Sequence, residues 1–273
     1  MPQPSSPSRI LAPARVAAAV ITLPLLPVLA HGADAAAAAE PGAEYAGKPI
    51  EEIIVPGRYI GGDAVSAMKV GTPLIDTPQS LTVISREQID DQAFTDIGDV
   101  LRYTPGASIG QGEGHRDQIT IRGQNTTADF FLDGLRDDVQ YYRPLYNLER
   151  IEILRGANAM IFGRGGGGGV INRVTKQPTR DESFTGAAIA TDTFGEYSIA
   201  LDANVALGGG RAFRANVFHE HLDNHRDRFE GDRFAINPTF LQTFGEDTSL
   251  VLSYELVDDD RVVDRGVPSL DRE

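Results

Sequence analysis

The stretch that most constrains the fold of this chain covers residues 150–176. Residues 151–154 carry the short apolar alternation that is typical of a β-strand. One helical turn is expected over residues 158–162, before residues 163–169, which are all glycine except for one arginine. So many glycines exclude a packed helix and allow close approach of backbones. A second strand, residues 170–174, follows. The stretch therefore predicts two strands with a glycine-rich connection.

The glycine run also fits a nucleotide-binding pattern, and this alternative can be weighed from the sequence. Residues 163–168 satisfy G-x-G-x-x-G, but in dinucleotide sites these glycines open a helix that holds the pyrophosphate. Here they open a β-branched strand, and no Gly-Lys-Ser/Thr of a phosphate-binding loop follows. A soluble nucleotide-binding enzyme with a glycine-rich loop is the less favoured alternative, and nucleotide binding by residues 45–178 would test it.

Composition excludes several other classes of protein. The chain of 273 residues has no cysteine, so it can hold neither disulfides nor a thiolate metal site. Its 39 acidic and 25 basic residues give a net charge of -14, which argues against a nucleic-acid partner. His219, His221 and His225 lie close in sequence but indicate polar surface rather than a metal site. The acidic runs 137–138 and 258–260 are interpreted as solvated loops, so no metal is expected.

The N-terminal region predicts export. Residues 1–35 resemble a signal peptide, because Arg9 and Arg15 precede an apolar core over residues 16–30 and small residues follow. That core is shorter than the roughly 20 residues of a spanning helix. Residues 36–71 are polar and rich in alanine, glycine and proline, and we expect a flexible tail.

Residues 72–178 predict a small α+β domain. Strands are expected at residues 81–84, 119–121 and 130–132, in addition to the two around the glycine run. Ser85 and Gln88 form a capping-box pattern that starts a first helix, and a second helix is expected over residues 96–103. Short strands and two helices in mixed order are typical of a small α+β domain, a mixed sheet with short helices.

Residues 183–273 predict antiparallel strands that cross a membrane. Residues 197–207 alternate strictly between apolar and polar over the length of a transmembrane β-strand, and weaker alternation recurs in later segments. Strands are expected at 184–190, 197–207, 213–217, 234–240 and 250–256. The connections 208–210 and 245–247 are short, whereas 224–232 and 258–265 are longer and charged, as in outer-membrane barrels. A soluble β-sandwich would also alternate and is the alternative.

Five segments together resemble one known family. They are TPQSLTVI (77–84), LRYTPG (101–106), ITIRG (119–123), FFLDGLR (130–136) and residues 150–176. This combination resembles the plug domain of TonB-dependent outer-membrane receptors, and is most similar to siderophore receptors of the catecholate and hydroxamate type. Departures are Gln124 where an aromatic residue is usual, Ala157 where proline is usual and Phe162 where tyrosine is usual. The resemblance implies an α+β plug followed by the first strands of an incomplete transmembrane β-barrel.

The resemblance also implies roles for particular residues. A short acidic and β-branched segment in the tail, formed by Glu51, Glu52, Ile53, Ile54 and Val55, would be the TonB box, which pairs as a strand with the periplasmic partner TonB. Arg122 and Arg155, each before a glycine, would pair with barrel glutamates and latch the plug. The plug loops that face outward would contact the ligand through Gln111, His115, Arg116, Tyr141, Tyr142 and Arg143. The alternative for the two tyrosines is that they pack the plug against the barrel wall.

The expected function is therefore transport, not catalysis. The receptor would sit in the lipid of the bacterial outer membrane, bind a ferric siderophore and import it with energy relayed by TonB. The chelator would hold the iron, so no cofactor is expected. A receptor for cobalamin, haem or a sugar is the alternative within transport, and a passive porin would not account for the plug motifs. Plugged barrels have about 22 strands, whereas residues 183–273 suffice for about five, so we expect the N-terminal part of a longer receptor.

Overall fold

A computed structural model describes residues 80–156, 162–163, 167–245 and 248–266. These residues belong to one compact unit that spans Ile54–Glu273. The expected signal peptide, tail and TonB box lie outside the described residues, as does most of the helical turn expected at 158–162. No helix in the described residues is long and apolar enough to cross a membrane.

The first part of the chain, residues 80–176, forms a small α+β domain around a five-stranded sheet. The strand order is β1 (Leu81–Ser85), β7 (Leu148–Arg155), β8 (Gly169–Thr175), β5 (Phe130–Leu132) and β6 (Leu135–Arg136). Strands β7 and β8, which flank the glycine-rich connection, pair in antiparallel fashion, and β5 pairs with β8 in parallel. The two strands predicted around the glycine run are confirmed.

A second sheet and the helices complete this small domain. Strands β2 (Ala107–Gly110), β3 (Gln118–Ile121) and β4 (Gln124–Thr126) form a three-stranded sheet. The helices are α1 (Arg86–Asp91), α2 (Ile97–Arg102) and a 3-10 turn, η3 (Gly112–Gly114). Helix α1 begins where predicted, because the Ser85 side chain accepts a hydrogen bond from the Gln88 backbone N–H at 3.2 Å.

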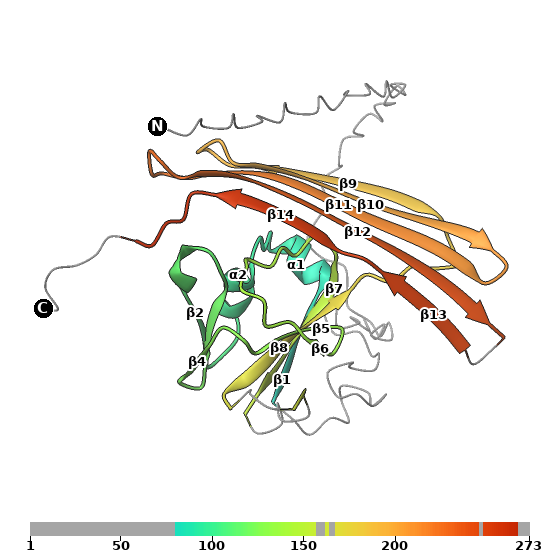
Figure 1. Ribbon diagram of the computed structural model, residues 1–273, viewed down its shortest axis with the longest axis horizontal. Coiled ribbons are helices and arrows are strands. Elements are labelled where there is room, and N and C mark those ends of the chain that lie inside the picture. The colour runs from blue at the N-terminus through green and yellow to red at the C-terminus, as the bar shows by residue number, and fades with distance from the viewer. Residues whose placement is uncertain (1–79, 157–161, 164–166, 246–247, 267–273) are drawn as a thin grey trace, which may run out of the picture. The chain divides into compact units, whose positions relative to one another are not determined.

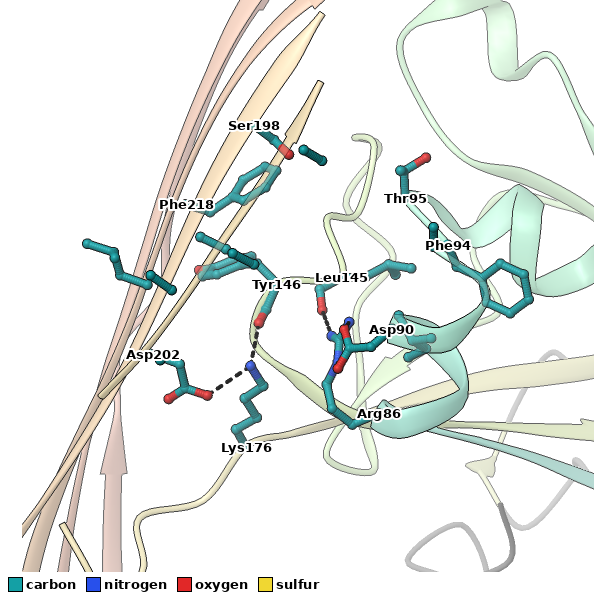
Figure 2. Close-up of a pocket in the computed structure, with 18 of the residues that line it drawn as sticks. Arg86, Asp90, Phe94, Thr95, Leu145, Tyr146, Lys176, Ser198, Asp202 and Phe218 are labelled. Atoms are coloured by element: carbon teal, nitrogen blue, oxygen red, sulfur yellow. Dashed lines mark hydrogen bonds and ion pairs between the residues drawn. The ribbon is translucent and has the colours of Figure 1, made fainter. Parts of the chain in front are cut away.

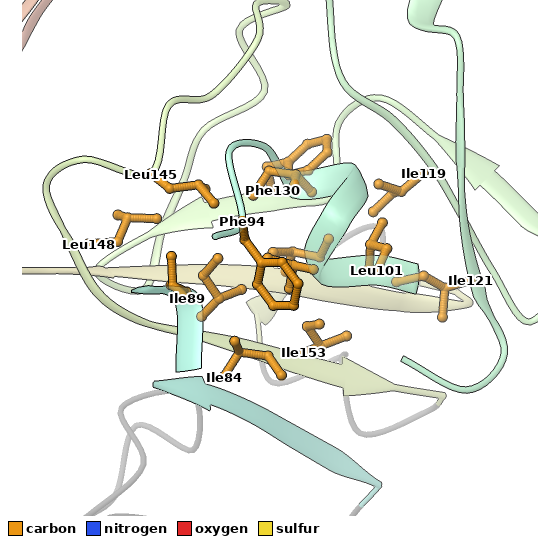
Figure 3. Close-up of a cluster of buried hydrophobic side chains, with 14 residues drawn as sticks. Ile84, Ile89, Phe94, Leu101, Ile119, Ile121, Phe130, Leu145, Leu148 and Ile153 are labelled. Carbon is orange, nitrogen blue, oxygen red and sulfur yellow. The ribbon is translucent and has the colours of Figure 1, made fainter. Parts of the chain in front are cut away.

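The hydrophobic core of the small domain lies between the helices and the five-stranded sheet (Figure 3). Ile89 from α1 and Leu101 from α2 are almost fully buried against Phe130, Ile151 and Ile153 of the sheet. Each such side chain contributes roughly 1.5–3 kcal/mol when it leaves water. This packing fixes the sheet, and the sheet in turn positions the loops that leave its strands.

The second part of the chain is an antiparallel sheet of long neighbouring strands, here called the strand wall (residues 184–261; Figure 1). Its strands are β9 (Phe184–Thr191), β10 (Tyr197–Gly208), β11 (Arg211–Asp223), β12 (Glu230–Phe244), β13 (Thr248–Ser253) and β14 (Leu256–Arg261). Each of β9 to β12 pairs with the next strand along the chain, and both β13 and β14 pair with β12.

The polarity of the strand wall is the reverse of that in a soluble sheet. In β10, Leu201 and Val205 are each 45% exposed, whereas Asn204 is 1% exposed. Asn216 of β11 and Asn237 of β12 are equally buried. A soluble sandwich buries its apolar face, so this arrangement excludes that alternative and matches strands with an apolar face toward lipid.

The last strand departs from the sequence prediction. We expected one strand over 250–256 and a charged loop over 258–265, but the strand is interrupted after Ser253 and then continues as β14 to Arg261. The register does not change across the interruption, since Thr239 pairs with Ser253 and Ile236 with Leu256. The loop prediction is wrong for residues 258–261, because β14 keeps pairing with β12 as far as Gly231.

Candidate functional site

Two loops of the small domain bring most of the predicted ligand-contacting residues together. The first follows β2 and contains Gln111, and the second precedes β7 and contains Tyr141 and Tyr142. The Asp117 backbone N–H donates to the Tyr141 carbonyl oxygen at 3.3 Å, and the Tyr142 hydroxyl donates to the Gln111 carbonyl oxygen at 3.3 Å. The two loops are therefore joined directly, although they are about 30 residues apart in sequence.

Arg143 does not face outward with the other predicted residues. It is 1% exposed, and its guanidinium lies 3.9 Å from the centre of the Phe130 ring. Its Nε donates to Asp137 Oδ2 at 3.0 Å and its Nη1 to Asp117 Oδ2 at 3.4 Å, with further bonds to three backbone carbonyls. These hydrogen bonds of Arg143 are internal to the small domain, although the residue also borders the cavity of about 390 Å³ described below.

Sequence reasoning missed the acidic and basic partners in this buried cluster. Asp137, interpreted as part of a solvated pair, accepts hydrogen bonds from Arg143, from Arg173 and from the Tyr141 hydroxyl at 3.0 Å. The interpretation fits exposed Asp138 but is wrong for Asp137. Arg173 also donates to the Tyr141 hydroxyl at 3.0 Å. The sequence placed Arg173 in a strand but did not indicate this role.

Burial sets the protonation of this cluster. It raises the pKa of Asp117 to about 6, although the positive charge of Arg143 opposes the change. Burial likewise raises the pKa of Tyr141, against the positive charge of Arg173. The cluster is therefore a closed network that fixes the loops in place.

A cavity of about 390 Å³ lies between the first loop and the strand wall. Among the predicted ligand-contacting residues, Gln111, Tyr142 and Arg143 line it, together with Arg102 of α2, Arg233 of β12 and Arg261 of β14. The Arg261 guanidinium lies 4.8 Å from the centre of the Tyr142 ring, and burial raises the pKa of this tyrosine. Four carboxylates, those of Asp96, Glu196, Glu220 and Asp264, line the cavity as well. Arg233 pairs with Glu220, so the cavity offers a tyrosine ring for stacking rather than an excess of positive charge.

His115 and Arg116 belong to the same loop but do not line this cavity. His115 is exposed at the end of η3. Arg116 is bound within the small domain, where it pairs with Glu113 at 3.2 Å and donates to Gln140. They lie at the margin of the candidate ligand site.

Arg122 and Arg155, the predicted latch residues, lie next to each other. The Arg122 guanidinium packs against Gly156, where a Cβ atom would come within 2.3 Å of Nη1. Arg155 donates to the Pro105 carbonyl at 2.8 Å and to Thr82 Oγ1 at 3.0 Å. Within the described part of the chain, neither guanidinium pairs with a carboxylate.

Polar contacts that the sequence did not predict join the small domain to the strand wall (Figure 2). Lys176 Nζ lies 3.0 Å from Asp202 Oδ2 of β10 and donates to the Tyr146 carbonyl at 2.9 Å. Arg214 holds both oxygens of Asp202, at 2.8 and 2.7 Å. The Tyr146 ring stacks on Phe218 of β11, with ring centres 5.6 Å apart. Burial lowers the pKa of Lys176, and the charge of Asp202 opposes this.

A larger cavity of about 500 Å³ lies beside these contacts (Figure 2). Arg86 and Asp90 of α1 line it on one side, and small wall residues such as Gly186, Ala188 and Ala200 line it on the other. Arg86 pairs with Asp90 and donates to the Leu145 carbonyl at 2.8 Å, so its charge is used within the small domain. The cavity results from the small wall side chains.

The two histidines of β11 contact an aromatic ring. Among the described residues, no group of three histidine, cysteine, aspartate or glutamate side chains could hold a metal ion. His219 and His221 instead contact the Tyr197 ring, with ring centres 6.0 and 5.4 Å apart. His221 Nδ1 also lies 3.1 Å from Asp232 Oδ1.

Comparisons with known proteins agree on one family. Residues 73–170 match the model of the TonB-dependent receptor plug domain. The chain is 34% identical over 258 residues to the probable TonB-dependent receptor BfrD of Bordetella pertussis, a match over 92% of this chain and 33% of that protein. It is 32% identical over 209 residues to the catecholate siderophore receptor Fiu of Escherichia coli K12, over 74% of this chain and 27% of Fiu.

Solved structures give the same result. The open form of the ferric-catecholate import receptor Fiu from Escherichia coli K12 matches with a TM-score of 0.69 and 30% identity, over 77% of this chain and 31% of that one. The siderophore receptor PiuA from Acinetobacter baumannii matches with a TM-score of 0.67 and 29% identity, over 74% of this chain and 30% of that one. The chain spans about a third of the length of these relatives or less.

Proposed function

Because this chain belongs to the TonB-dependent receptors, with a plug domain followed by strands of the barrel wall, we propose that it is part of a receptor that imports a ferric siderophore. The family consists of outer-membrane transport receptors and not of enzymes, so the nucleotide-binding alternative is set aside. The proposed receptor takes its ligand at the outer face of the membrane and uses energy relayed by TonB. The small domain described above is called the plug domain from here on.

The cavity of about 390 Å³ carries the proposal of a siderophore. It is lined by Gln111, Tyr142 and Arg102 of the plug domain and by Arg233 and Arg261 of the strand wall. Ferric catecholates have aromatic rings, so the Tyr142 ring and the guanidinium group of Arg261 beside it can stack with them. The names of Fiu and PiuA, a catecholate and a siderophore receptor, support the same class of ligand for this chain.

The other predicted residues take secondary places in this proposal. His115 and Arg116 form the margin of the site, and the Tyr141 hydroxyl is bonded to Asp137 and Arg173 within the plug domain. Arg143 is left out of the ligand-contacting set because it is buried and internally bonded. The chelator supplies the ligands of the iron.

Energy coupling is proposed to use the tail and the two latch arginines. Residues 51–55 form the TonB box, which adds as a strand to TonB. Arg122 and Arg155 lie together without carboxylate partners among the described residues, which suits pairing with acidic side chains of the barrel. Charge-assisted pairs of this kind hold a domain in place and can still exchange partners.

Uptake assays with defined chelates test the proposal. The gene that encodes this chain would be deleted and restored in an iron-starved host, and uptake of radiolabelled iron would be followed with a ferric catecholate and a ferric hydroxamate. Labelled cobalamin and haem serve as the competing ligands. The restored gene is expected to restore uptake of one of the ferric chelates. If it restored uptake of cobalamin or haem only, the siderophore proposal would be contradicted.

Two variants separate binding from energy coupling. Tyr142→Ala removes the ring in the cavity and is expected to weaken chelate binding about tenfold, since a stacked or cation-π contact contributes about 1–2 kcal/mol. Deletion of residues 51–55 is expected to abolish uptake while binding stays intact. Glu149→Ala, at an exposed plug residue, is the control. Uptake that survives the deletion would refute the TonB-box assignment.

A further inference from the structure

Four polar residues form one row across the inner face of the strand wall. Asp202 of β10 pairs with Asn216 of β11, and Asn216 pairs with Asn237 of β12. Glu255 holds the next position, since Ser253 pairs with Thr239 on one side of it and Leu256 with Ile236 on the other. We name Asp202, Asn216, Asn237 and Glu255 the docking row.

Three neighbouring residues of the plug domain contact both ends of the docking row. Lys176 reaches Asp202 at 3.0 Å and Asn216 Oδ1 at 3.4 Å. At the other end, Asn147 Nδ2 donates to Glu255 Oε1 at 3.0 Å and the Tyr146 hydroxyl donates to the same oxygen at 3.3 Å. The Lys176 backbone N–H donates to the Asn147 carbonyl at 2.9 Å, so the two contacts are joined within the plug domain.

The backbone beside Glu255 is shaped for this contact. Pro238 has no N–H, and the ladder between β12 and the last strand is interrupted opposite it. Asn237 Nδ2 compensates by donating to the Tyr254 carbonyl at 2.8 Å and to Ser253 Oγ at 3.0 Å. The polar side chain thus fixes the strand at the point where Glu255 turns inward.

Stability alone does not account for the docking row. Asn147 Oδ1, Asn216 Nδ2 and Asn237 Oδ1 are buried and have no hydrogen-bond partner among the described residues. Unpaired buried polar atoms lower stability, and apolar side chains of similar size would avoid this cost. Hydrogen bonds are directional, so they favour a single position of the plug domain against the strand wall.

We propose that the docking row positions the plug domain against the barrel wall, with Tyr146, Asn147 and Lys176 as its matching surface. Glu255 is the most important positioning residue, because one of its oxygens accepts the hydrogen bonds from both Tyr146 and Asn147. The contact needs an acceptor rather than a charge at this position. It differs from the proposed arginine latch in both its residues and its partners, and it does not depend on which ligand the receptor imports.

Distance measurements on the receptor, expressed from its own gene in outer membranes, test the proposal without any ligand. Spin labels would be attached at Leu135→Cys in the plug domain and Ile189→Cys in β9, which are 76% and 77% exposed. Pulsed electron resonance is expected to give one narrow distance distribution with Glu255 and with Glu255→Gln, since glutamine keeps the accepting oxygen. Glu255→Ala is expected to broaden or shift the distribution, whereas Glu149→Ala, the exposed control, leaves it unchanged.

A reversed hydrogen bond distinguishes direct pairing from a general loss of structure. Asn147→Asp places two carboxylates against each other and is expected to broaden the distribution. Adding Glu255→Gln gives the new carboxylate a donor and should restore the narrow distribution. This pair of variants decides the matter even if Glu255→Ala does not assemble.

Import rates add a second readout. Glu255→Ala is expected to slow uptake of a bound ferric chelate about tenfold, while the half-saturating concentration changes less than about twofold, because Glu255 does not line the ligand cavity. An unchanged distance distribution in Glu255→Ala would overturn the proposal. So would failure of the combined Asn147→Asp and Glu255→Gln variant to restore it.

Discussion

Replacement of Arg143 by methionine tests whether this residue supports the loops from inside or contacts a ligand. Methionine is long and apolar and fits a buried site, but it cannot donate a hydrogen bond. The change would leave the carboxylates of Asp117 and Asp137 without their shared cation and would remove the stack on Phe130. Three backbone carbonyls of the second loop would lose their donor as well.

The expected loss of stability follows from these contacts. Removing one partner of a buried ion pair costs about 3–5 kcal/mol, because a charge is left without compensation. Here Arg173 still pairs with Asp137, which limits the cost, whereas Asp117 loses its partner and the carbonyls add to it. We expect local opening of the loops to become easier by about 3–5 kcal/mol, which is roughly two to four powers of ten in the opening equilibrium.

Hydrogen exchange of the receptor, followed by mass spectrometry, measures this opening directly. Peptides that contain Asp117 and Tyr141 should exchange faster in Arg143→Met by the factor given above, since exchange of protected amides reports local opening. Arg180→Met, at an exposed residue that does not line the ligand cavity, is the control and should change the opening free energy by less than about 0.5 kcal/mol. Unchanged protection with weakened chelate binding in Arg143→Met would refute the buried role and restore the ligand-contacting one.

Three further predictions concern other elements of the plug domain. Gly168→Ala should destabilise the plug domain by about 1–3 kcal/mol in urea unfolding, because a Cβ would lie 2.0 Å from the Ile121 carbonyl oxygen. Gly167→Ala is the control and should be near neutral, because a Cβ there would have no atom within 4 Å. Equal effects of the two changes would contradict this account. Burial raises the pKa of Asp117 from 3.8 to about 6, so the contribution of this group to stability is present below about pH 4 and is lost as the pH rises through about 6. The wild-type receptor should therefore lose about 3 kcal/mol of stability over this pH range in thermal unfolding, whereas Asp117→Asn should not. The same pH dependence in both proteins would disprove this account. Ser85→Ala should make helix α1 open about 1 kcal/mol more easily by hydrogen exchange, and no change would show that the cap adds nothing.

Local sequence signals were sufficient to predict much of the fold. The helix start at Ser85 depends on residues within one turn, and the alternation over 197–207 depends on the two-residue period of a single strand. The strands on either side of the glycine run were likewise visible, since apolar alternation and glycine act over a few residues. Each of these predictions needed no knowledge of distant contacts.

The glycine run shows where local reasoning stops. Sequence indicated that glycine allows close approach, but not which glycine is approached. In the structure, a Cβ at Gly168 or Gly169 would meet backbone oxygens of Ile121 and Leu154, whereas one at Gly167 would meet nothing. These neighbours come from other strands, so only the folded sheet distinguishes the positions.

The buried cluster and the docking row were not predictable for the same reason. A tyrosine pair followed by Arg143 has the composition of a binding loop, and only the position of Asp117 and Phe130 shows that the arginine points inward. In the sequence, Glu255 is one polar position of an alternating segment and does not differ from other polar positions there. Its role depends on Asn147, 108 residues earlier in the chain.

The alternation in the sequence was enough to place the polar residues of the strand wall on one face, but it did not show which residues they contact. Leu201 and Val205 remain exposed while Asn216 and Asn237 are buried, which is unfavourable in water at about 25 cal/mol per Å² of exposed apolar surface. In a bilayer the same outer face is favourable, and the inner face then needs a polar neighbour rather than lipid. The plug domain supplies that neighbour through Lys176 and Asn147. The alternation therefore predicts only that the inner side of the wall meets water or a polar domain, and the choice of partners follows from how the plug domain folds.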